Sequence, residues 1–340
     1  MIDTASRPGL RSIRMTDDEA RQVCELSNEC VRRFDDVESA AFLREVTVIA
    51  HDLPGRIRRE VNLARLDESL HALVVRDHAV GDEIGPTPSH WREAANAASM
   101  VHSFTLMLYA SLFGEAIGWE SQQDARVVSD VVPTPGQESS TVSSSSTREL
   151  GWHTEDAFSP FRADYVGLFC LRNPDAVATT VGMLAPHALD ETTRNLLCEP
   201  RYQFLPDPSH DAHRPGEGTG AAGTLSAGPV QLLPILRGGP DGRDLCIDSD
   251  YTLPAPGDAL AARALAVAHE VIASSLYELV LHAGDVCFLD NRNVVHGRRP
   301  FHARFDGQDR WLKRVNVTRD LRRSSGARVG TARRVVRSTP

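Results

Sequence analysis

The feature of the sequence that most constrains the fold is a set of three potential metal ligands from distant parts of the chain. His153 and Glu155 stand two residues apart, and His296 lies far downstream. In an extended strand, residues i and i+2 project from the same face, so His153 and Glu155 can reach one small ion without distortion of the backbone. Asp156, which follows Glu155, faces away on such a strand. A chain that uses all three ligands must fold so that two distant segments meet.

Two imidazoles and one carboxylate on one face of a metal leave positions open for substrates, which is typical of non-haem Fe(II) oxygenases. The alternative is chance, because the chain has 13 histidines and a His-x-Glu pair often binds nothing. Arg310 favours the metal site, since a guanidinium facing the same pocket can hold a carboxylate through two hydrogen bonds. A cosubstrate that chelates metal through a 2-oxo acid and ends in a carboxylate fits this need, which indicates 2-oxoglutarate. Without the His–Glu pair, Arg310 would be interpreted as a surface residue.

The pattern of secondary structure changes near residue 118. The N-terminal part predicts helices after the N-cap Thr16, after Pro54 and over residues 99–117, with one short strand at residues 70–75. Beyond it, helices are expected at residues 187–198 and 258–277. Strands are predicted at residues 126–132, 141–145, 165–171, 230–236, 244–251, 278–281, 285–289 and 311–318. This order favours a mainly β protein with flanking helices, in which the strands form an antiparallel barrel or jelly roll.

Composition excludes several classes of protein. The net charge of −9 argues against a nucleic-acid-binding protein. The six cysteines are scattered without a Cys-x-x-Cys pair, which indicates reduced thiols in a cytoplasmic protein. The N-terminus lacks the apolar core of a signal peptide, and no apolar run approaches the length of a membrane span. We therefore expect a single globular domain between a loose tail at residues 1–15 and a basic tail at residues 326–340.

Two further patterns are interpreted as surface features. Residues 218–223 match the dinucleotide fingerprint Gly-x-Gly-x-x-Gly, but they follow a polar segment and not a strand, which indicates a surface loop. The arginines from Arg319 onward could contact an anionic partner, although a solvated terminus is the simpler interpretation.

Three longer motifs resemble a known family. They are LGWHTEDAFSPFRADY at residues 150–165, VHGRR at residues 295–299 and DRWLKR at residues 309–314. They are similar to the clavaminate synthase-like Fe(II)/2-oxoglutarate oxygenases, in the branch of arginine β-hydroxylases of antibiotic pathways. The resemblance covers residues 16–325 and implies a double-stranded β-helix (jelly roll, cupin-like) core in a single oxygenase domain. The wider superfamily usually has Asp at the position of Glu155, whereas this branch has Glu.

The resemblance also implies roles for individual residues. His153, Glu155 and His296 would bind Fe(II), and Arg310 would bind 2-oxoglutarate, with O2 as the second cosubstrate. At the amino-acid end of the substrate, Gln122 and Glu155 would contact the α-amino group and Arg314 the carboxylate. Ser143 would contribute a hydroxyl there, although a run of serines is otherwise typical of a linker.

The far end of the substrate would meet acidic residues. Asp248 and Asp250, two residues apart on one strand, would repel each other if buried, unless a guanidinium lies between them. A solvated turn or the Asp-x-Asp metal site of a glycosyltransferase are the alternatives. Asp207 and Ser209 begin a polar segment, residues 207–228, that the family uses as a lid over the substrate.

The resulting hypothesis is hydroxylation of the β-carbon of free L-arginine, a small-molecule reaction without nucleic acid or membrane. Dihydroxylation at C3 and C4, or β-hydroxylation of a related guanidino amino acid such as L-enduracididine, remains open. A β-barrel metal protein without oxygenase activity and a binding protein that has lost catalysis are alternatives of other classes. The oligomeric state, including a homodimer, is also open.

Overall fold

The computed structural model describes residues 7–94, 96–210, 231–238, 244–330 and 332–337. Its longer helices are α1 (Asp17–Arg33), α2 (Ala40–Ile49), α3 (Gly55–Arg65), α4 (Ala97–Phe113), α5 (Glu191–Leu197) and α6 (Ala259–Ser275). The start of α1 follows the predicted N-cap, because Thr16 Oγ1 accepts from the Glu19 amide at 3.2 Å and Glu19 Oε2 accepts from the Thr16 amide at 2.9 Å. Helix α2 was not predicted.

Helix α4 is apolar on all sides and buried, as predicted, but it ends four residues earlier than expected, at Phe113. A Cβ atom on Gly114 would lie 2.3 Å from the Thr318 carbonyl oxygen, so the chain passes too close to its neighbour for any other residue. The next residues form strand β3 (Glu115–Trp119), which pairs with the end of β15 (Trp311–Thr318). The predicted helical residues 115–117 are therefore in a strand.

A nine-stranded sheet forms the centre of the molecule. Its order is β1-β2-β13-β6-β15-β3-β17-β16, and β4 pairs with β15 beside this path. Besides β3 and β15, its strands are β1 (Leu10–Arg14), β2 (Ala72–Arg76), β4 (Val128–Val131), β6 (Tyr165–Arg172), β13 (Val286–Asp290), β16 (Arg328–Val329) and β17 (Val335–Val336).

A four-stranded sheet, ordered β12-β7-β14-β5, faces the larger one. Its strands are β12 (Tyr277–Val280), β7 (Ala178–Met183), β14 (Val294–Arg298) and β5 (Leu150–His153). Two short ribbons pair β9 (Leu236–Arg237) with β10 (Asp244–Leu245) and β8 (Tyr202–Phe204) with β11 (Thr252–Pro254).

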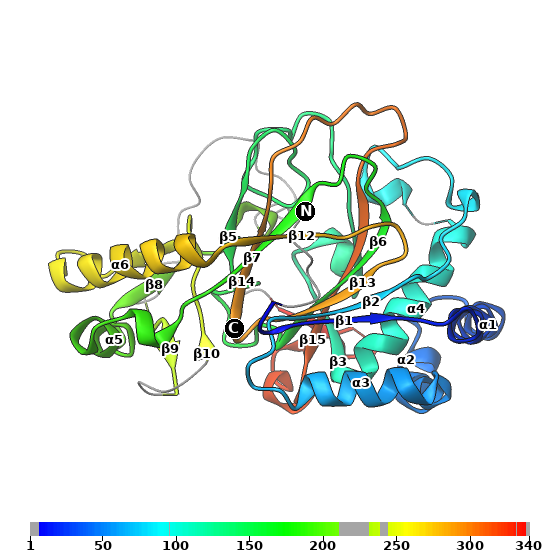
Figure 1. The fold of residues 1–340 in the computed structure, drawn as a ribbon, viewed down its shortest axis with the longest axis horizontal. Helices are drawn as coiled ribbons and strands as arrows, with labels where there is room; N and C mark the ends of the chain where they lie inside the picture. The colour runs from blue at the N-terminus through cyan, green and yellow to red at the C-terminus, as the bar shows by residue number, and fades with distance from the viewer. Residues whose placement is uncertain (1–6, 95, 211–230, 239–243, 331, 338–340) are drawn as a thin grey trace.

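The two sheets and the helices form layers (Figure 1). Alternating residues of β2 show the arrangement, because Leu73 and Val75 pack against the N-terminal helices while Ala72 and Val74 pack toward the smaller sheet. Helices α1–α4 thus cover the outer face of the larger sheet. Helices α5 and α6, at the left of Figure 1, pack on the other side of the smaller sheet. The chain is mainly β-sheet with flanking helices, as the sequence predicts.

Both expected tails contribute strands. Residues 10–14, expected to be loose, form β1 and pair in parallel with β2, which buries Leu10 and Ile13. In the basic C-terminal segment, Val336 is buried and β17 pairs in parallel with β3, while Arg334 forms an ion pair with Glu115. Each segment carries apolar residues that become buried when it pairs with a distant strand. Composition alone did not reveal this pairing.

Three other predicted segments either differ from the structure or lie outside its described residues. Residues 141–145 form turns and not a strand, because their backbone groups bond locally and to Thr134. Residues 231–236 and 244–251 form only short strand pieces. The Gly-x-Gly-x-x-Gly match at residues 218–223 lies outside the described residues, as does all but the beginning of the expected lid.

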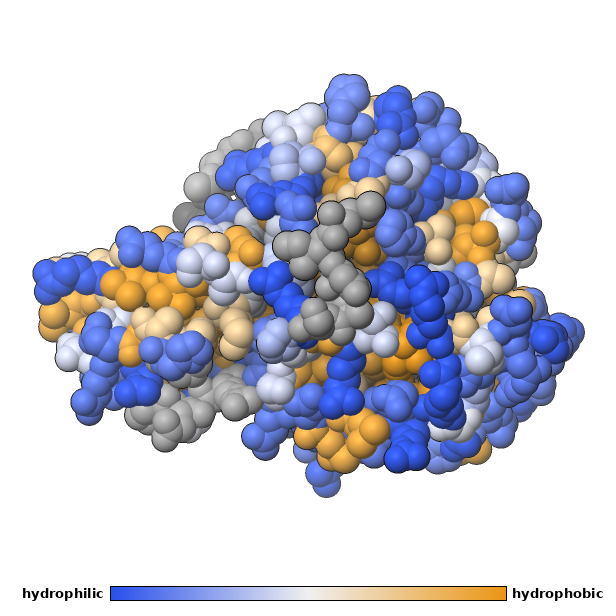
Figure 2. Space-filling view, viewed as in Figure 1, coloured by the Kyte–Doolittle hydropathy of each residue, from blue (hydrophilic) through white to orange (hydrophobic). Residues whose placement is uncertain are grey.

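The view in Figure 2 shows mostly hydrophilic residues on this face, with hydrophobic residues exposed over α6 at the left. No helix in the described ranges combines the length and the apolar character that crossing a membrane requires.

Candidate active site

Pairing of β5 with β14 brings the two distant histidines together. In this antiparallel pair His153 lies directly opposite His296, and their ring centroids are 4.6 Å apart. The register shifts between His296 and Arg298, so that two residues of β5 face a single residue of β14. Gly297 occupies this position because a Cβ atom there would lie 2.5 Å from the Leu150 carbonyl oxygen. The bulge lets the side chain of His153 turn toward His296, while the preceding Trp152 packs in the core beneath α6.

Glu155 reaches the histidines from a turn. Strand β5 ends at His153, so the strand alternation expected for residues 153 and 155 does not hold. Bonds to distant segments hold the turn instead. The Thr154 amide donates to Ile247 O at 2.8 Å, and the Glu155 amide donates to Asn291 Oδ1 at 2.7 Å. Asn291 donates back to Glu155 O at 3.2 Å.

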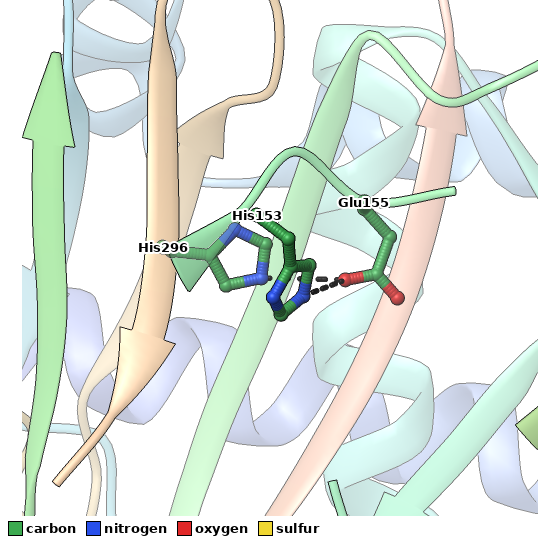
Figure 3. A group of neighbouring side chains, drawn as sticks. All are labelled: His153, Glu155 and His296. Carbon is green, nitrogen blue, oxygen red and sulfur yellow. Dashed lines mark ion pairs between the residues drawn. The ribbon is translucent and has the colours of Figure 1, made fainter. Parts of the chain in front are cut away.

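The three side chains converge on one point (Figure 3). Glu155 Oε2 lies 3.6 Å from His153 Nε2 and 3.3 Å from His296 Nε2, and the candidate ligand atoms are all within 4.8 Å of one another. Ligands about 2.1 Å from a metal and at right angles to each other are separated by about 3 Å. The spacing therefore fits one divalent cation after a small contraction.

The protonation of this group also fits a cation. Burial opposes a charge on His153, but its hydrogen bond to Glu155 and the nearby carboxylates raise its pKa to about 9. Burial likewise disfavours ionised Glu155, yet Arg314 and the two imidazoles hold the pKa of Glu155 well below its usual range. Both shifts reflect the attraction of the Glu155 carboxylate for positive charge at this point. His153 Nδ1 is 2.9 Å from Gly151 O, which leaves Nε2 to act as the ligand atom.

Arg310 is a buried cation without a carboxylate partner in the described part of the chain. Its Nη2 donates to Thr179 Oγ1 at 3.4 Å, and its Nε has no hydrogen-bond partner. Burial lowers the pKa of Arg310 to about 10, so it remains charged at neutral pH. Buried charges are normally paired, and this one therefore calls for an anionic ligand.

All the site residues that the sequence predicts line one cleft that is open to solvent. These residues are Gln122, Ser143, His153, Glu155, Asp207, Ser209, Asp248, Asp250, His296, Arg310 and Arg314. At one end Arg314 Nη1 donates to Glu155 Oε1 at 2.5 Å, and Arg314 Nη2 donates to Gln122 Oε1 at 3.1 Å. Arg314 thus contacts Glu155 and Gln122, two of the other three residues expected at the amino-acid end of a substrate.

The other end of the cleft is acidic. Asp248 Oδ1 accepts from the amides of Asp250 and Tyr251 at 2.8 and 2.9 Å, so the two aspartates are joined by a turn and not by the predicted strand. Burial raises the pKa of Tyr251, and the charges of Asp207, Asp250 and Asp248 raise it further. Asp250 also lies 3.9 Å from a half-exposed cation, Arg148. Three carboxylates in one region favour a cationic ligand.

Sequence reasoning missed three residues around the cleft. Asp156 lines the same cleft, and it accepts from Trp119 Nε1 at 2.5 Å and lies 3.0 Å from His210 Nε2. Arg298 follows His296 by two residues on the same face of β14, a signal that strand alternation could have revealed. His210 lacked any such signal, because its partners are distant in the chain.

Comparison with known proteins identifies the family. The family model for the taurine catabolism dioxygenases TauD and TfdA matches residues 103–316. The chain belongs to this family. The matched part of this TauD-family chain contains all three candidate metal ligands together with Arg310 and Arg314.

Relatives of this TauD-family chain match almost its whole length. It is 38% identical to an enduracididine beta-hydroxylase of Streptomyces hygroscopicus, over 96% of this chain and 99% of the relative. It is 34% identical to an L-ornithine/L-arginine 3-hydroxylase of Catenulispora acidiphila, over 89% and 93% of the two chains. The crystal structure of the non-heme iron oxygenase OrfP with Fe and alpha-ketoglutaric acid is 38% identical, has a TM-score of 0.87, and is matched over 96% of this chain and 99% of that one.

Proposed function

We propose that this chain is an Fe(II)- and 2-oxoglutarate-dependent dioxygenase that hydroxylates C3 of free L-arginine in the biosynthesis of an antibiotic. The observation that carries the proposal is that one cleft holds a His–Glu–His group, an acidic end and a buried arginine with no carboxylate partner among the described residues. The relatives support it, since they are named as hydroxylases of enduracididine, ornithine and arginine. OrfP structures contain L-Arg and (3S)-hydroxy-L-Arg.

In this proposal His153, Glu155 and His296 bind Fe(II), and Arg310 with Thr179 binds the distal carboxylate of 2-oxoglutarate. The bound iron supplies the activation of O2, with 2-oxoglutarate as the electron donor and succinate and CO2 as its products. Arg310 lies at the start of β15 and contacts β7, so the cosubstrate would lie between the two sheets. We propose that these sheets form the two walls of a double-stranded β-helix.

The amino-acid end of the substrate would replace an ion pair within the protein. Arg314 pairs with Glu155 and contacts Gln122. The substrate carboxylate would accept hydrogen bonds from Arg314. The α-ammonium group would donate to Glu155 Oε1 and Gln122 Oε1. Arg314 and Glu155 would then each keep a partner of opposite charge. A substrate with only a carboxylate or only an ammonium group would leave one of them unpaired.

The guanidinium would lie among Asp207, Asp248 and Asp250. Two charged ends held at fixed positions leave little freedom for the carbon chain between them, and this selects the C–H bond that reacts. A misplacement of about 1 Å can lower a rate about a hundredfold. A cyclised guanidino amino acid has a shorter reach, and the enduracididine relative makes such a substrate the second candidate.

The test is product analysis with L-arginine, Fe(II), 2-oxoglutarate and air. We expect one added oxygen atom, at C3, with one succinate per hydroxylated product. Two added oxygens would indicate dihydroxylation, and preference for L-enduracididine over arginine would favour the second candidate. Turnover without O2, or without succinate, would contradict the proposal.

Variants connect the product to the cleft. His296→Ala should abolish the colour that forms when Fe(II) and 2-oxoglutarate are mixed without oxygen, because one metal ligand is lost. Asp250→Ala should weaken arginine binding about tenfold or more and 2-oxoglutarate binding little, as expected for loss of a charged hydrogen-bond partner. Equal losses for both ligands would exclude Asp250 from the guanidinium site.

A further inference from the structure

Gln122 is assigned to the amino-acid end of the substrate, and the position of its amide depends on two neighbours. A guanidinium only donates hydrogen bonds, so the Gln122 oxygen faces Arg314 and its amide nitrogen points away from it. The nitrogen donates to Ser209 Oγ at 2.8 Å and lies 3.0 Å from His210 Nε2. Ser209 and His210 therefore form the wall behind the amide.

His210 is itself held on every side. Its side chain is 2% exposed, its Nδ1 lies 2.7 Å from Ser121 Oγ and its Nε2 lies 3.0 Å from Asp156 Oδ1. The rings of Phe158 and Trp119 pack edge-on against the imidazole, with centroids 4.7 and 5.7 Å away. An imidazole with these contacts has no freedom to change rotamer.

Asp156 links this histidine to the two charged groups of the site. It follows the proposed metal ligand Glu155, and its Oδ2 accepts from Asn316 Nδ2 at 3.1 Å. Asn316 lies two residues after Arg314 on the same face of β15. His210 thus joins the segment of Gln122 to the segments that carry Glu155 and Arg314.

We propose that His210 is a positioning residue for the substrate α-amino group. It acts through Gln122, whose amide nitrogen donates to His210 Nε2 so that the amide oxygen faces the cleft, and its ring is held by Ser121, Phe158 and Trp119. The proposal rests on the proposed function, since Gln122 matters only if an amino acid binds beside Glu155. In the described part of the chain no hydrogen bond or ring contact joins His210 directly to His153, Glu155, His296 or Arg310, so we expect metal and 2-oxoglutarate binding to change little without it.

The test compares His210→Phe with His210→Gln. Phenylalanine keeps the aromatic packing and removes all three polar contacts, so we expect KM for arginine to rise about tenfold. We also expect less hydroxyarginine per succinate, because a loosely held amino acid misplaces C3. KM for 2-oxoglutarate should stay within about twofold. Glutamine can place its amide oxygen near the position of Nε2, where it accepts from the Gln122 amide nitrogen, so it should recover most of both losses.

The matched control is His102→Phe. His102 is also buried and packs edge-on against a ring, that of Phe169 at 5.2 Å, but it lies outside the cleft. This variant should leave KM for arginine and the product-to-succinate ratio unchanged. His210→Phe with wild-type values for both, or with an equal rise in KM for the two substrates, overturns the proposal, as does His210→Gln that recovers nothing.

Calorimetry of L-arginine binding to the protein loaded with Mn(II) and 2-oxoglutarate separates this inference from the proposed function. If the wild type binds arginine without hydroxylating it, the proposed function fails, and the loss of affinity in His210→Phe still decides the role of His210. If the wild type does not bind arginine, both proposals fail.

Discussion

Three buried or half-buried arginines line the cleft, and their partners differ. Arg314 is neutralised by Glu155, whereas Arg310 has no carboxylate contact among the described residues. Arg298 donates to Ser145 Oγ, Ser146 O and Arg148 O, and burial lowers its pKa to about 9, with the nearby charge of Arg310 as a further cause. In the described part of the chain the hydrogen-bond partners of Arg298 and Arg310 are neutral groups, so an anion that binds beside these cations should stabilise the protein. Removal of Arg310 and removal of Arg314 should therefore have different effects on stability and on 2-oxoglutarate binding.

Arg310→Met should raise the Kd for 2-oxoglutarate about 100-fold, which corresponds to about 3 kcal/mol for a lost two-pronged ionic contact. The free protein should keep or increase its melting temperature, because an unpaired buried charge is removed. Arg314→Met is the control, and it should destabilise the free protein by about 3 kcal/mol, since it leaves Glu155 buried without its guanidinium. Thermal unfolding and 2-oxoglutarate titration measure both. A large loss of stability in Arg310→Met would show that its charge is already compensated.

At the scale of elements, the pair β5–β14 determines the geometry of the metal site. The bulge before His153 and the close approach at Gly297 bring the two imidazoles side by side, with their rings tilted by 50°. A side chain at residue 297 would collide with backbone atoms, which cannot relieve the clash by a change of rotamer. The strand pairing and the metal site should therefore fail together.

Gly297→Ala should destabilise the protein by about 1–3 kcal/mol and weaken metal binding, because β5 must move away from β14 and carries His153 with it. Gly326→Ala is the control, since a Cβ atom there meets nothing within 4 Å. Denaturant unfolding and titration with Co(II) give the two quantities. A Gly297→Ala protein that is destabilised but binds Co(II) normally would show that the bulge does not position His153.

At the scale of the whole molecule, the core between helices and sheet contains buried histidines. Burial lowers the pKa values of His78 and His102 to about 4 each. In the unfolded chain a histidine has a pKa of about 6.5, so between pH 6.5 and 4 the unfolded state binds protons that the folded state does not. The free energy of unfolding therefore falls as the pH falls through this window.

His102→Phe should remove one of the protons that the unfolded chain binds and the folded chain does not. Its free energy of unfolding should fall less steeply than that of the wild type, by at most about 1.4 kcal/mol per pH unit between pH 6.5 and 4. Urea unfolding of both proteins at several pH values in this range is the measurement. Parallel curves would mean that His102 is protonated to the same extent in the folded and unfolded chains.

The sequence by itself determined the elements whose signals are local. The cap at Thr16, the apolar helix α4 and the strands β6 and β15 are recognisable from neighbouring residues, and the three family motifs contain His153, Glu155, His296, Arg310 and Arg314. Only the tertiary structure decided how β1 and β17 pair, that Glu155 reaches the histidines from a turn, that Arg310 is buried without a carboxylate contact, and that His210 contacts Gln122. The reason is physical. Periodicity and capping depend on residues a few positions apart, whereas register, burial and charge pairing depend on contacts between segments that are far apart in the chain.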